Sequence, residues 1–70
     1  MNNKELRNEY GFSFFVIYDG FNGRAYDVPA VDDKWVNDDD IVVVGGFYSG
    51  DVAFATALAI NNGVIKISEL

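Results

Sequence analysis

The segment at residues 12–19, with the sequence FSFFVIYD, constrains the fold more than any other part of the chain. Aromatic and β-branched residues dominate it, and these residue types favour extended strands. Successive side chains of a strand point to opposite faces. One face then carries Phe12, Phe14, Val16 and Tyr18, and the other carries Ser13, Phe15, Ile17 and Asp19. Because both faces are largely apolar, we predict a central strand.

Turn-forming residues follow this strand. Asp19-Gly20 and Asn22-Gly23 tolerate positive φ, so we expect a hairpin whose second strand covers residues 24–28. Pro29 cannot donate to a ladder, and residues 29–40 (PAVDDKWVNDDD) show no apolar period, which predicts an exposed acidic loop. The β-branched run at 41–44, followed by Gly45-Gly46, predicts a third strand that can extend to Phe47.

The strongest helix signal lies at about residues 51–62. Ser49 or Asp51 can cap its first turn, strong helix formers follow, and Gly63 suits the left-handed position after its C-terminus. Residues 64–70 (VIKISEL) alternate in polarity, which predicts a final edge strand. We expect residues 1–10 to be flexible or to form one helical turn.

The predicted element order is therefore β-β-β-α-β. One helix and a sheet bury their apolar surfaces only against each other, so we predict an α+β two-layer sandwich with a mostly antiparallel four-stranded sheet. With 70 residues, the chain can build a single domain over 1–70.

Most familiar catalytic chemistry is excluded by composition. The chain has no histidine and no cysteine, so it has no imidazole base, no thiolate nucleophile and no common transition-metal ligand set. We expect a protein that is not an enzyme and that needs no metal and no cofactor.

The glycines at 45–50 have part of the pattern of a phosphate cradle. Gly45 and Gly50 have the GxxxxG spacing, but Asp51 and Val52 stand where a P-loop needs Lys and Ser or Thr. Ser49 is no nucleophile elbow, because its flanking glycines and a histidine are missing. The pattern favours a tight turn with a helix cap over a nucleotide site.

The acidic residues are concentrated between residues 27 and 51. This stretch carries the whole formal net charge of −6, because the charges of the remaining chain cancel. Lys34 is its only base, and its carboxylates are Asp27, Asp32, Asp33, Asp38, Asp39, Asp40 and Asp51. The contiguous run at 38–40 lacks the alternating ligands and the glycine of a calcium loop.

Two interpretations of this stretch stay open. It can be a solvated loop that keeps an apolar protein soluble. It can also be a surface that occupies the basic groove of a nucleic-acid-binding protein, since duplex DNA presents one negative charge per ~1.7 Å. Trp35 and Tyr48 are candidate aromatic contacts beside it, although Trp35 can equally fold back onto the sheet as a lid. The chain's own field repels nucleic acid.

The predicted helix is apolar nearly all round, which is typical of a helix buried on more than one side. If Phe54, Ala55 and Leu58 face the sheet, the outer side is left for a partner or a homodimer. That possible dimer face consists of Val52, Thr56, Ala59 and Ile60.

In its small size, acidity and lack of cysteine, the chain resembles the inhibitors that phages encode against host enzymes, including anti-CRISPR proteins and DNA mimics. The resemblance implies a non-enzymatic inhibitor, phage-encoded and acting in the host cytoplasm, that blocks the DNA- or RNA-binding surface of a basic effector. The alternative is a dimeric interaction module, such as an antitoxin-like or accessory protein, that acts through its apolar helix. No secretory signal or membrane span is evident in the sequence, so we expect a cytoplasmic protein that contacts no membrane.

Overall fold

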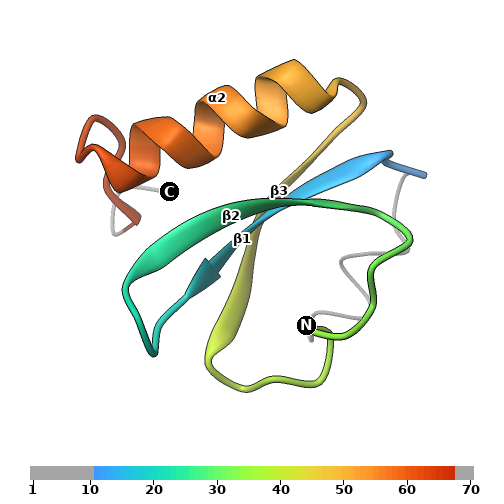
Figure 1. Ribbon diagram of the computed structural model, residues 1–70, viewed down its shortest axis with the longest axis horizontal. Coiled ribbons are helices and arrows are strands. Elements are labelled where there is room, and N and C mark those ends of the chain that lie inside the picture. The colour runs from blue at the N-terminus through green and yellow to red at the C-terminus, as the bar shows by residue number, and fades with distance from the viewer. Residues whose placement is uncertain (1–10, 68–70) are drawn as a thin grey trace.

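The structure is a computed structural model that describes residues 11–67. Its elements are β1 (Phe14–Asp19), β2 (Arg24–Pro29), β3 (Ile41–Phe47) and α2 (Gly50–Asn61). The strands form one antiparallel sheet in the order β2-β1-β3 (Figure 1). Within the described residues, the architecture is thus a small α+β fold with a three-stranded antiparallel sheet and one helix on one face.

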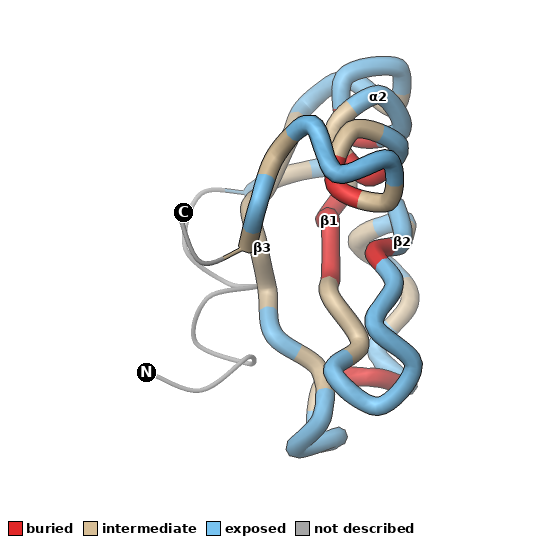
Figure 2. Tube along the Cα trace, turned by 90° about the vertical axis from the view of Figure 1, so that its left-hand side faces the viewer, coloured by how far each residue is buried: buried red, intermediate tan, exposed pale blue. Residues whose placement is uncertain are grey.

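β1 is the central strand, as its two apolar faces predict. On one face Val16 packs with Ala25 of β2 and with the buried residues of α2, and Phe14 and Tyr18 extend this cluster. On the other face Phe15 and Ile17 pack with Trp35 from the loop. Figure 2 shows the resulting line of buried residues along β1, with α2 beside it. The sheet is therefore covered on both sides by different parts of the chain.

The hairpin and the third strand lie close to their predicted positions. β2 begins at Arg24, and β3 begins at Ile41 and continues to Phe47. The register between β1 and β3 shifts between Val16 and Ile17, which marks a β-bulge in the pairing. The Gly45-Gly46 pair follows this shift, and Phe12 lies so close to Gly46 that a Cβ there would overlap its ring.

α2 agrees with the predicted helix to within one residue at each end. Ser49 is its N-cap, with Oγ accepting from the Val52 N–H at 3.5 Å, and Gly63 has a φ of 77° just beyond its C-terminus. The helix lies closest to β2 and β1. At its last residue, the Asn61 side chain accepts a hydrogen bond from the Ala25 N–H at 2.7 Å and donates one to the Ala25 carbonyl at 2.9 Å. This pair of hydrogen bonds ties the end of α2 to the edge of β2 that pairs with no other strand of the described residues.

Two predictions about the C-terminal half are wrong. Residues 64–67 do not form a strand, so the sheet of the described residues has three strands where the sequence predicts four. The remainder of the predicted edge strand lies outside the described residues, as do residues 1–10. Ile65 and Ile67 instead pack against the cluster under α2.

The face of the helix is also reversed from the prediction. Ala53, Ala57 and Ile60 are buried against the sheet, whereas Phe54, Ala55 and Leu58 are exposed. The two alanines let α2 approach the sheet closely, and the large side chains of β1 fill the space between. Of the predicted outer face, Ile60 is in the core, Val52 is exposed, and Thr56 and Ala59 lie half-buried on the flanks.

Candidate protein-binding surface

The β1–β2 turn and the loop before β3 meet at one end of the sheet. The Gly20 N–H donates to the Asp40 carbonyl at 2.8 Å, and Asp19 stands opposite Ile41 in the ladder between β1 and β3. Antiparallel pairing therefore places the carboxylate that ends β1 beside the run of carboxylates that precedes β3. We call this surface the acidic end and define it as Asp19, Asp38, Asp39 and Asp40.

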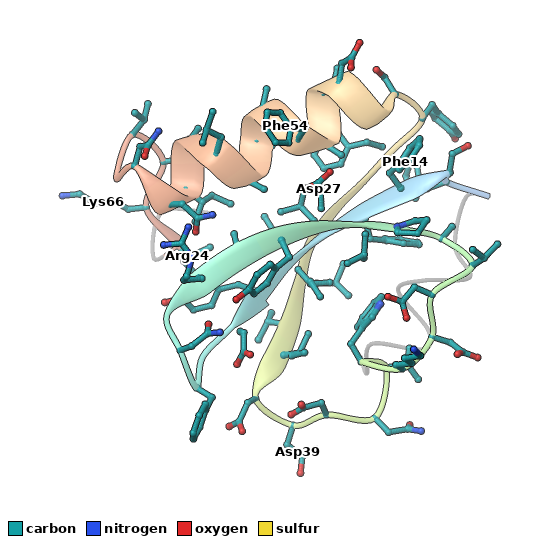
Figure 3. All side chains as sticks on the ribbon, viewed as in Figure 1. Phe14, Arg24, Asp27, Asp39, Phe54 and Lys66 are labelled. Atoms are coloured by element: carbon teal, nitrogen blue, oxygen red, sulfur yellow. The ribbon has the colours of Figure 1, made fainter. Side chains whose placement is uncertain are left out.

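Short hydrogen bonds to the backbone fix the acidic end. Asp19 Oδ1 accepts from the Phe21 N–H and Asp38 Oδ1 from the Asp40 N–H, each at 2.9 Å. Both are Asx-type turns, in which the side chain replaces a backbone acceptor. Asp38, Asp39 and Asp40 are exposed, and Figure 3 shows Asp39 projecting away from the sheet. The structure thus holds a group of solvated carboxylates on a defined backbone.

An exposed aromatic residue lies in the turn at the acidic end. Phe21, at the tip of the β1–β2 turn, has 85% of its surface exposed. Large rigid side chains of this kind supply anchors in protein interfaces, while charged neighbours at the rim steer association. The sequence does not single out residue 21, because a turn residue between Gly20 and Asn22 gives no periodic signal.

The other acidic residues lie elsewhere. Asp27 stands opposite Val16 in the ladder, so its side chain points to the α2 side of the sheet, as Figure 3 shows. Asp51 is exposed in the first turn of α2. In the loop, half-buried Asp32 accepts from the Lys34 N–H at 3.1 Å, and Asp33 is exposed. The carboxylates of residues 27–51 are therefore spread over both sides of the sheet and do not form one surface.

Neither predicted aromatic contact joins the acidic end. Trp35 is only 5% exposed, and the centroids of its ring and the Phe15 ring lie 6.2 Å apart. It therefore forms the lid over the sheet that the sequence analysis gives as the alternative. A ring buried in this way offers no surface to a binding protein in this conformation. Tyr48 is exposed and contacts the Phe12 ring at 5.0 Å, but it follows β3, at the far end of that strand from Asp40. A seven-residue strand spans roughly 23 Å.

The second exposed surface is the outer side of α2. Phe54 and Leu58 are 57% and 48% exposed, and residues 52–60 contain no charged side chain. Figure 3 shows Phe54 on the helix, clear of the sheet. This surface is apolar, whereas the acidic end is charged, and the two lie on different elements.

In the part of the chain that the structure describes, no three carboxylates lie in a group that could hold a metal ion, the run at 38–40 included. No helix among residues 11–67 has the length and apolar character needed to cross a membrane. Comparisons with protein-family models, with curated proteins and with solved structures found no significant match.

Proposed function

We propose that the protein is a non-enzymatic inhibitor that binds a basic, nucleic-acid-binding effector and occupies its DNA- or RNA-binding surface. The observation that carries this proposal is the acidic end, where strand pairing and the Gly20–Asp40 backbone hydrogen bond bring Asp19 and the run at 38–40 to the end of the sheet whose turn carries the exposed Phe21. Lysines and arginines that bind phosphates also bind carboxylates, because both offer charged oxygen acceptors.

The fixed backbone of the acidic end supports this function. The two Asx-type bonds hold the turn and the loop before any partner binds, so less conformational freedom is lost on association. In this proposal the carboxylates steer the encounter with a basic groove, and Phe21 supplies apolar contact once the surfaces meet. The same field repels nucleic acid, so the partner is a protein.

The first step of the test identifies the partner. The protein is immobilised and used to capture proteins from a lysate of its native host, and mass spectrometry identifies what is bound. A captured nucleic-acid-binding protein is then purified, and its complex with fluorescently labelled DNA or RNA is titrated with this protein while anisotropy is measured. We expect stoichiometric release of the nucleic acid, because an inhibitor that fills a groove acts by mass action.

Two triple variants locate the binding surface. Asp38→Asn, Asp39→Asn and Asp40→Asn together remove three charges from the acidic end, while the amide oxygen introduced at position 38 still accepts from the N–H of residue 40. The matched control removes three charges elsewhere, through Asp27→Asn, Asp32→Asn and Asp33→Asn, and the amide oxygen introduced at position 32 still accepts from the Lys34 N–H. We expect the first variant to bind about tenfold more weakly and the control to stay near wild type. Equal weakening in both would show that only net charge matters, and wild-type affinity in the first would refute the proposal.

The alternative function is a dimeric interaction module that acts through its helix. The exposed apolar side of α2 favours this alternative, because monomeric soluble proteins rarely expose contiguous apolar patches. A protein that dimerises and releases no nucleic acid from any captured partner would support it over inhibition.

A further inference from the structure

One stripe of α2 points directly away from the sheet. Asp51, Ala55 and Leu58 recur at intervals of four and three residues, so they follow one another along one side of the helix, and the C-cap Asn62 continues the same line. All four are exposed. The residues that contact the sheet, Ala53, Ala57 and Ile60, lie on the opposite side.

This outer stripe is complementary to itself when a second copy runs antiparallel. With a two-fold axis between Ala55 and Leu58, residues at equal distances from the axis face each other. Leu58 of each copy then lies against the small Ala55 of the other, and Asp51 lies opposite Asn62. A large side chain meets a small one, and a carboxylate meets an amide that can donate to it. The same symmetry brings both Phe54 side chains to one edge of the contact.

The charge pattern of the helix argues against the other occupants. Residues 52–60 carry no charge, so nothing on this side attracts a polyanion or an acidic peptide. A membrane surface is also disfavoured, because helices that lie on anionic lipids carry Lys and Arg on their polar face, and this chain has a net charge of −6. A second copy, by contrast, presents matching apolar and polar positions over the whole stripe.

We infer that α2 is a homodimer interface in which two copies pair antiparallel through Ala55 and Leu58, with Asp51 of one copy facing Asn62 of the other. The helix has 12 residues and is about 18 Å long, so the contact is short and the dimer weak. Two copies with the same net charge also repel each other, and salt screens this repulsion. Dimerisation therefore strengthens as salt rises, whereas binding of the acidic end to a basic partner weakens.

The test is light scattering coupled to size exclusion, on the full chain between roughly 10 µM and 1 mM. We expect the mass to rise from 7.8 kDa toward twice that value with concentration, and to rise further when NaCl is increased from about 0.05 M to 0.5 M. Leu58→Glu is expected to remain a monomer throughout. Val31→Glu, which adds the same charge at a residue 88% exposed on the loop after β2, is expected to dimerise like wild type.

Exchanging the residues at positions 51 and 62 tests the register in which the two helices pair. Asn62→Asp places two carboxylates opposite each other at both ends of the contact and is expected to weaken the dimer about tenfold. Adding Asp51→Asn restores an acid–amide pair and is expected to restore dimerisation. Circular dichroism checks that each variant is folded. A wild-type monomer at 1 mM in high salt, a dimer that tolerates Leu58→Glu, or a double variant that stays as weak as Asn62→Asp would overturn the inference.

Discussion

The hydrogen bonds between Asn61 and Ala25 make the docking of α2 on the sheet sensitive to one side chain. Asn61 satisfies both the N–H and the carbonyl of Ala25, a buried residue whose backbone faces away from β1 at the sheet edge. Asn61→Ala removes a donor and an acceptor together. Because no neighbouring strand pairs with β2 on this side in the described structure, only water can replace them.

The expected cost follows from the two groups left without a partner. An unpaired buried polar group costs ~1–3 kcal/mol, and we take the lower value for each because water can enter the space left by the amide. Alanine also recovers about 0.5 kcal/mol of helix propensity. The net loss is about 1.5 kcal/mol, out of a total of roughly 3–10 kcal/mol for a 70-residue domain. The melting temperature should fall by roughly 6–12 °C.

Asn61→Asp gives the same prediction a pH dependence. The ionised carboxylate accepts from the Ala25 N–H but repels the Ala25 carbonyl, whereas the protonated acid donates to that carbonyl as the amide does. The folded state therefore raises the pKa of this carboxyl above its ordinary value near 3.9. The variant is relatively more stable below that ordinary value and loses this stability as the pH rises through the raised pKa. The difference in free energy of unfolding between wild type and Asn61→Asp is expected to be larger at pH 7 than at pH 4.

Urea unfolding followed by circular dichroism measures these differences directly. Asn62→Ala is the matched control, since Asn62 is the adjacent exposed asparagine and its side chain lacks the bonds to Ala25. We expect it to stay within about 0.5 kcal/mol of wild type. If Asn61→Ala is as stable as Asn62→Ala, the pair of hydrogen bonds does not hold the helix on the sheet, and the reasoning fails.

Two further predictions concern the sheet and its lid. Gly46→Ala is expected to lose about 1–3 kcal/mol of stability in urea unfolding, because its Cβ would overlap the Phe12 ring. Gly45→Ala is the comparison, since its Cβ would meet the Phe47 ring at 3.4 Å, and equal losses in both would contradict the argument. Trp35 is the only tryptophan of the chain and is buried, so its fluorescence should be blue-shifted and weakly quenched by acrylamide until the protein unfolds. Strong quenching in the folded protein would place Trp35 in solvent.

The central part of the fold could be predicted because its signals are local. Phe15 and Ile17 alternate with Val16 and Tyr18, and only a central strand buries both sets. Ser49 and Gly63 mark the ends of α2 through capping preferences that depend on a few adjacent residues. The prediction of a final strand is wrong because the alternation at residues 64–67 comes from two isoleucines that pack against the cluster under α2 without forming a strand.

The orientation of α2 could not be predicted from its own sequence. Apolar residues surround the helix, so no side stands out, and ranking by size alone favours burying Phe54 and Leu58. Packing on the sheet gives the opposite orientation, because Phe14 and Tyr18 occupy the space between β1 and the helix. Small residues at 53 and 57 then fit against them, and the larger helix residues turn to solvent. The interface inferred for α2 is a direct consequence of this packing.

The antiparallel topology separates acidic residues that are close together in the sequence. Asp27 lies on one side of the sheet and the run at 38–40 at its end, because the chain changes direction between β2 and β3. The same topology brings in Asp19, which is about twenty residues earlier in the sequence and is balanced by distant bases when charges are counted along the chain. The charged surface and the apolar stripe of α2 consequently lie on separate elements. A salt titration can therefore separate their effects, since partner binding through the carboxylates weakens while pairing of the helices strengthens.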